Sequence, residues 1–166
     1  MRIAIVLVLA LSGTAAASAD GMTVVGLGTS SATGEPGWIL RVEGRTDSGR
    51  AHGDDDERAI TGSRIGLEAW RTGHHFGFAV PLGWYVGAQV RSVRATLGVG
   101  VALWAFDHTE DETFQGAAPF ASSTIDLMLG NLVISLDARL SRQLFSERSD
   151  FNLYSLILMV GKRFEP

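Results

Sequence analysis

Hydrophobic and polar residues alternate with a period of two along most of the chain, which places neighbouring side chains on opposite faces of a strand. The clearest case is segment 93–106, where Val93, Leu97 and Val101 share one face while Arg94 and Gly98 lie on the other. The same alternation is readable in segments 25–28, 38–45, 64–70, 76–85, 120–129, 132–141 and 153–164. The pattern therefore predicts an all-β chain of eight antiparallel strands.

Turn-forming residues separate these segments at 34–37, 72–74, 130–131 and 147–150. Two longer, acidic connections are expected at 46–59 and 107–118. Pro81 lies inside an expected strand, and since proline has no N–H for the ladder it predicts a bulge or bend there.

The start of the chain has the three parts of a secretory signal. Met1 and Arg2 precede the apolar run 3–11, and Ala17-Ser18-Ala19 fits the small-x-small cleavage rule. We predict a signal peptide at 1–19, Sec-type export, and one mature domain at 20–166. No other segment approaches the roughly 20 apolar residues of a membrane helix, so any membrane span in the mature chain has to consist of strands.

Composition narrows the possible functions. The net charge is −4 and the pI is about 5.5, which argues against a nucleic-acid partner. The absence of cysteine excludes disulfides, thiolate metal sites and a cysteine nucleophile.

Alternation alone leaves two arrangements open. A soluble lipocalin-like barrel in the periplasm would bury the aliphatic face around an apolar ligand, whereas a membrane barrel turns that face to lipid. The charged face is also the small face, with Gly26, Gly66, Gly98 and Gly161 on it. Small residues among a few long ones suit a narrow lumen, so the pattern favours the membrane barrel.

On this interpretation the charged face fills the lumen, where arginines and carboxylates pair as a structural network. Its predicted members are Arg41, Glu43, Arg45, Arg64, Glu68, Arg94, Asp126, Asp137, Arg139 and Arg163. Aromatic residues near the ends of the expected strands, on the aliphatic face, are predicted to lie at the membrane interfaces: Trp38, Trp84, Tyr154 and Phe164.

With its signal peptide, eight amphipathic strands and final strand Tyr154-x-Leu156-x-Leu158-x-Val160-x-Lys162-x-Phe164, the chain resembles the small outer-membrane β-barrels of the OmpA-like and OmpX-like class. The resemblance implies an antiparallel up-and-down transmembrane barrel in the cell outer membrane. It also implies outer-membrane lipid and the barrel-assembly machinery as partners. The chain departs from the class at its end, because Glu165-Pro166 follow Phe164. In the class, the aromatic residue is usually terminal. The connection 46–59 is long for a periplasmic turn.

Residues that could carry chemistry are few. His74 and His75 lie in a turn, and the acidic runs 54–57 and 107–112 lack the spacing of a calcium loop, so no metal site and no cofactor are expected. A lipid A-modifying hydrolase or acyltransferase would need a serine–histidine–acid set. Serines such as Ser122, Ser123, Ser135 and Ser141 stand in no such motif.

The sequence therefore predicts a non-enzymatic outer-membrane barrel with a packed lumen. We expect it to act in envelope integrity or surface contact through its loops. A soluble periplasmic barrel and a lipid A-modifying enzyme are the alternatives.

Overall fold

The computed structural model describes residues 21–32, 34–47, 57–73, 75–109, 112–142 and 152–164, with the backbone alone at 106–109 and 112–114. The predicted signal peptide 1–19, the turn 147–150, His74 and most of the acidic run 54–57 lie outside these residues.

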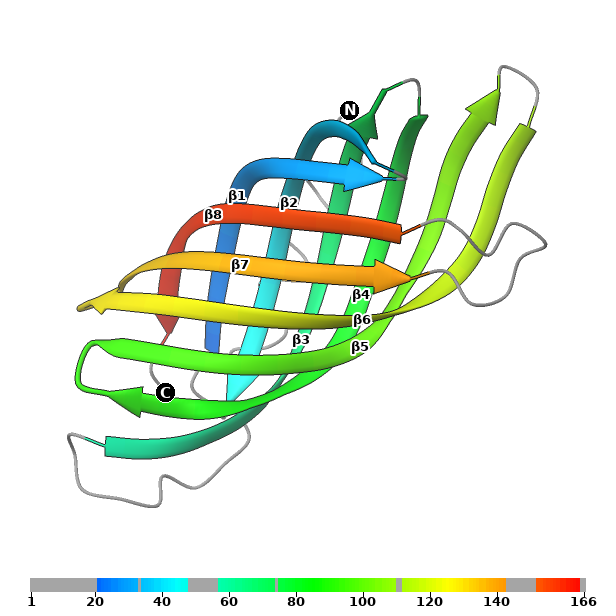
Figure 1. The fold of residues 1–166 in the computed structure, drawn as a ribbon. Coiled ribbons are helices and arrows are strands. Elements are labelled where there is room, and N and C mark those ends of the chain that lie inside the picture. The colour runs from blue at the N-terminus through cyan, green and yellow to red at the C-terminus, as the bar shows by residue number, and fades with distance from the viewer. Residues whose placement is uncertain are drawn as a thin grey trace.

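Within the described residues, eight antiparallel strands close into a barrel in sequence order (Figure 1). The strands are β1 Gly21–Ala32, β2 Glu35–Asp47, β3 Glu57–Thr72, β4 His75–Val90, β5 Val93–Thr109, β6 Glu112–Leu129, β7 Leu132–Arg142 and β8 Asn152–Phe164. Strand β1 pairs with both β2 and β8, so the ladder has no free edge where it closes. The predicted fold class, an all-β up-and-down barrel of eight strands, is confirmed.

No helix among the described residues is long and apolar enough to cross a membrane.

The two faces of the barrel wall are opposite in character to those of a soluble barrel. On β7, Ser135, Asp137 and Arg139 are buried in the lumen, whereas Leu136 and Leu140 are 46% and 42% exposed. The same pattern runs around the wall, where Leu97, Val99 and Trp84 are more than half exposed. This arrangement is the reverse of what a lipocalin-like apolar cavity requires, and it leaves an outward aliphatic surface that water would not solvate favourably.

Glycines make room in the narrow lumen for large side chains from neighbouring strands. Gly83 on β4 pairs with Gly100 on β5, which pairs in turn with Phe120 on β6. A Cβ atom at Gly100 would lie 2.6 Å from the Phe120 ring, and one at Gly83 would lie 2.9 Å from it. The ring therefore covers two glycines, and both positions require the absence of a side chain.

Several strands extend further than the alternation indicated. The expected loop 107–118 is wrong in its extent, because β5 continues to Thr109 and β6 starts at Glu112. The turn 34–37 is likewise shorter, since β2 starts at Glu35, and the connection between β2 and β3 narrows to 48–56. Pairing of β5 with β6 continues through the polar segment, with one register shift between Asp107 and Thr109.

Pro81 produces no bulge. The β3–β4 register is the same before and after it, with Ile65 opposite Leu82 and Glu68 opposite Ala79. The ladder skips the pairs between them, because proline cannot donate the hydrogen bond.

We expect Gly100→Ala to destabilise the barrel by about 1 to 3 kcal/mol, the usual cost of overpacking. The matched control is Gly44→Ala on the outward face, where the nearest atom to an added Cβ is 3.9 Å away. Urea unfolding of both variants in lipid vesicles measures the difference. Equal unfolding midpoints would show that Phe120 does not need the glycines.

Candidate functional site

Ten charged side chains from β2, β3, β5, β6 and β7 meet inside the described part of the barrel. We call this set the lumen ion network. It comprises Arg41, Glu43, Arg45, Asp47, Arg64, Glu68, Arg94, Asp126, Asp137 and Arg139. Five are arginines and five are carboxylates, so the network is electrically neutral.

Six members form a closed ring of alternating charge across the lumen. Around the ring the order is Glu43, Arg64, Asp137, Arg41, Glu68 and Arg139, returning to Glu43. Arg41 Nε lies 2.5 Å from Glu68 Oε1, and Arg139 Nη2 lies 3.0 Å from Glu43 Oε2. Because the ring joins β2 and β3 to β7, it ties together parts of the wall that are not neighbours in the sheet.

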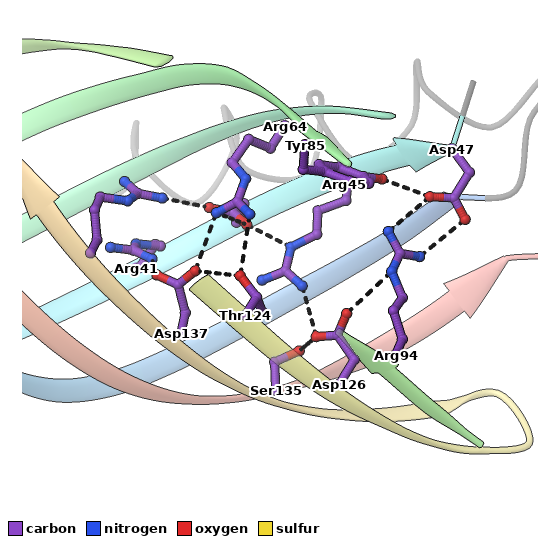
Figure 2. Close-up of polar contacts among 12 residues, drawn as sticks. Arg41, Arg45, Asp47, Arg64, Tyr85, Arg94, Thr124, Asp126, Ser135 and Asp137 are labelled. Carbon is purple, nitrogen blue, oxygen red and sulfur yellow. Dashed lines mark hydrogen bonds and ion pairs between the residues drawn. The ribbon is translucent and has the colours of Figure 1, made fainter. Parts of the chain in front are cut away.

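The other four members extend from the ring as a chain towards the end of the barrel that holds Gly21 and Phe164. Arg45 lies 2.6 Å from Glu43 and 2.8 Å from Asp126. Arg94 then bridges Asp126, at 3.5 Å, and Asp47, at 2.8 Å (Figure 2). Glu43 is thus the branch point, in contact with three arginines.

Hydroxyl groups donate hydrogen bonds to the carboxylates. Thr124 donates to Asp137 at 2.7 Å, and Ser135 donates to Asp126. Tyr85, on β4, donates to Asp47 at 2.7 Å, and its ring centroid lies 5.0 Å from the Arg94 guanidinium carbon. Figure 2 shows that these hydroxyl groups reach the lumen ion network from different strands.

Burial makes the pairing essential to the fold. Arg41, Glu43, Asp126 and Asp137 are 0% exposed. A buried charge without a counter-ion is strongly unfavourable, and removing one partner of a buried pair leaves such a charge behind. The network therefore fixes the lumen chemically, and its side chains occupy the space that a channel would use.

Buried apolar side chains fill the space that the lumen ion network leaves, and their largest members lie nearer the opposite end of the barrel. Trp70 and Trp104 meet edge to face with centroids 6.5 Å apart, and Ile39 and Leu153 belong to the same buried cluster. Arg139 connects the two regions, because its guanidinium carbon lies 4.3 Å from the Phe120 ring centroid. The same cluster includes Met22 and Val24, which pair with Arg45 and Glu43 in the register, so charged and apolar side chains share the lumen.

The structure brings nine of the ten predicted lumen residues into the lumen ion network. The exception is Arg163, which is half-buried near the end of β8, with its backbone N–H donating to the Asn131 carbonyl. Sequence reasoning missed Asp47, although Arg41, Glu43 and Arg45 precede it at alternate positions and their spacing points to it. The predicted strand stops at residue 45, whereas β2 continues to Asp47, the tenth member of the lumen ion network.

Of the four predicted interface aromatics, three lie near strand ends on the outward face. Trp38 and Tyr154 are close to the starts of β2 and β8, and Phe164 is the last residue of β8. Trp84 differs, because β4 continues to Val90 and leaves Trp84 well inside the outward aliphatic surface, 70% exposed.

Other candidate chemistry finds no assembled site in the part of the chain that is described. No group of three or more potential metal ligands occurs there. His75, the one histidine whose side chain is described, lies at the start of β4, whereas Ser122, Ser123, Ser135 and Ser141 lie on β6 and β7. These two strands are not neighbours of β4 in the sheet.

We expect Glu43→Gln to lower the free energy of unfolding by about 3 to 5 kcal/mol, because it leaves three arginines short of a carboxylate. Asp47→Asn, on the same strand and face, should cost less, about 1 to 3 kcal/mol. Asp47 contacts only Arg94 among the network arginines, and its side chain is 11% exposed. Urea unfolding in lipid vesicles gives both values.

If Glu43→Gln does not fold, adding Arg45→Met restores charge neutrality and should recover folded protein. An equal loss of stability in Glu43→Gln and Asp47→Asn would contradict the role of Glu43 as the branch point.

The fold has counterparts among solved structures. Neisserial surface protein A superposes with a TM-score of 0.64 at 10% identity, covering 89% of this chain and 98% of that one. The outer membrane enzyme PagL gives a TM-score of 0.61 at 14% identity, covering 84% of this chain and 97% of that one. The N-terminal β-barrel domain of Pseudomonas aeruginosa OprF gives 0.59 at 10% identity, covering 87% and 97%.

No protein-family model matches the chain, and no curated protein matches its sequence. The similarity is therefore one of architecture, at identities too low to transfer an activity. The chain has the fold of the small eight-stranded outer-membrane β-barrels.

Proposed function

We propose that this chain is an integral outer-membrane protein that makes surface contacts through the barrel end opposite Gly21 and Phe164, with no passage of solutes through its lumen. The observation that carries the proposal is the inverted wall: a neutral ion network inside and an exposed aliphatic surface outside. Lipid is the solvent that makes such a surface favourable. The fold similarity supports the same membrane.

The β5–β6 hairpin supports the contact role over a purely structural one. Pairing between β6 and β7 begins only at Phe120, opposite Ser141. The preceding segment of β6, from Glu112 to Pro119, pairs with β5. Figure 1 shows this hairpin rising beyond the end of β7, at the end of the barrel away from Gly21 and Phe164. A two-stranded projection of this kind extends beyond the rest of the wall, where a partner outside the barrel reaches it.

Catalysis is the competing proposal, because the outer membrane enzyme PagL has a similar fold. The sequence alternative names lipid A as its substrate. No arrangement of described side chains favours it, so we do not assign catalytic residues. A change in lipid A mass on expression of the chain would overturn the non-enzymatic proposal.

Membrane insertion predicts that the full chain, expressed with residues 1–19, sediments with outer membranes and shifts on a gel when boiled. A closed barrel resists detergent until it is heated, so the unboiled form should migrate separately. A soluble periplasmic protein without a heat shift would contradict the proposal.

The contact role is tested by shortening the hairpin. In the shortened variant, the two residues Asn-Gly replace residues 106–114 as a tight turn. This turn joins Ala105 to Gln115, which lie opposite each other in the register. The variant keeps Trp104, Ala118 and the lumen ion network, so its heat shift should be unchanged.

Cells that carry the full chain should attach to surfaces better than cells without it, and the shortened chain should lose that gain. Entry of a hydrophobic dye through the outer membrane serves as the second readout. If the full and shortened chains reduce dye entry equally and neither changes attachment, the function is envelope integrity and the hairpin assignment is wrong.

A further inference from the structure

The outward face carries a depression that extends from β8 across β1, β2 and β3 to β4, near the end of the barrel that holds Gly21 and Phe164. It has a volume of about 390 Å³, within the range of small-molecule sites. Two neighbouring rows of outward-facing residues line the depression, and each row consists of residues that are paired from one strand to the next. The first row runs Phe164, Gly21, Thr46, Ser63 and Trp84. The second row runs Thr23, Gly44, Ile65 and Leu82, and Lys162 continues this row on β8 outside the depression.

The first row explains the shape of the depression. Two aromatic side chains, Phe164 and Trp84, stand at its ends, with Gly21, Thr46 and Ser63 between them. Outward positions elsewhere on the wall carry residues such as Leu97, Leu127 and Leu158. Small residues between aromatic walls thus leave a groove of a width that flexible hydrocarbon can fill.

Two hydroxyl side chains lie in the middle of the largely apolar groove, which is unusual for a surface turned to lipid. Thr46 Oγ1 and Ser63 Oγ lie 2.8 Å apart and share one hydrogen bond. Only one of the two hydroxyl hydrogens is used in that bond, and a hydroxyl in hydrocarbon gains from every partner it finds. The second hydrogen is placed to be donated to an oxygen of a molecule in the groove.

A cation lies beside the groove. Lys162 is exposed on β8 opposite Thr23, and its Nζ lies 5.7 Å from the Phe164 ring centroid. A lysine at this depth extends towards the headgroup region and favours an anionic partner.

We propose that this groove binds a glycerophospholipid of the leaflet on the Gly21 and Phe164 side. Its acyl chain lies between Trp84 and Phe164, an ester carbonyl accepts from the Thr46–Ser63 pair, and the phosphate pairs with Lys162. Apolar walls, two hydroxyl groups and one nearby cation match the three chemical parts of such a lipid. The inference rests on the proposed membrane insertion.

Tryptophan quenching by brominated lipid tests the site directly. The chain has four tryptophans, and Trp70 and Trp104 are buried in the lumen. Trp38→Phe therefore leaves Trp84 as the outward-facing reporter. The protein is inserted into phosphatidylcholine vesicles that contain a small fraction of brominated phosphatidylglycerol, or of brominated phosphatidylcholine for comparison.

We expect brominated phosphatidylglycerol to quench Trp84 as effectively as about fivefold more brominated phosphatidylcholine, the preference that one lysine near an anionic headgroup supplies. Lys162→Gln should abolish this preference. Ser63→Leu fills the groove and should reduce quenching by both lipids to the level set by their share of the vesicle. Ala95→Leu, which adds the same bulk to the outward face of β5, is the matched control and should change neither value.

Quenching that follows the lipid fraction alone in the parent protein would overturn the site. An unchanged lipid preference in both Lys162→Gln and Ser63→Leu would also overturn it. A dimer cross-linked through Ser63→Cys would show that a second copy of the chain, and not a lipid, occupies the groove. A failure of membrane insertion is a different result, since no brominated lipid would then quench Trp84 at all.

Discussion

Arginine inside a closed barrel has to meet a carboxylate there, and much of this structure follows from that requirement. A guanidinium group cannot be neutralised by losing its proton in any ordinary environment, so burial leaves ion pairing as its means of compensation. The lumen ion network meets the requirement with equal numbers of arginines and carboxylates, arranged so that each arginine contacts two carboxylates. The ring closes only when β2, β3 and β7 enclose the same space. The electrostatics and the barrel topology therefore depend on each other.

The polar interior also determines what the exterior has to be. Strand side chains alternate, so a wall that turns its charged positions inward turns its aliphatic positions outward. In water an aliphatic outer surface is unfavourable, whereas in a bilayer the barrel needs such a surface in order to insert. The same filled interior supports the proposal that solutes do not pass through the lumen. On that proposal, the barrel acts through the surfaces that it presents, which are the hairpin beyond the rim and the grooved outer wall.

The sequence predicts the strand number, their order and the sidedness of the wall, because all three depend on a period of two that is visible in the residues themselves. It predicts the members of the lumen ion network almost completely for the same reason. The omissions all lie at strand ends. Polar residues occupy both faces at the end of β2 and around Asp107, so the alternation weakens there, whereas Val86, Ala88 and Val90 continue it to the end of β4. Asp47 lies beyond the predicted end of its strand. Trp84 lies next to the predicted end of its strand at residue 85, five residues before β4 ends. The predicted loop around Asp107 is wrong in extent, because β5 and β6 continue to pair through it. The pairs within the ion network could not be predicted, since they depend on which strands face each other across the lumen.

The most direct test of the account is the environment of the outward face in a membrane. The chain has no cysteine, so single cysteines at Leu97, Val99 and Val101 on β5 can each carry a spin label. In vesicles, the account predicts that all three labels are readily relaxed by oxygen, which dissolves in hydrocarbon, and are shielded from a water-soluble nickel complex. Ready access of the nickel complex to these labels would show that the aliphatic face meets water and would contradict the membrane barrel.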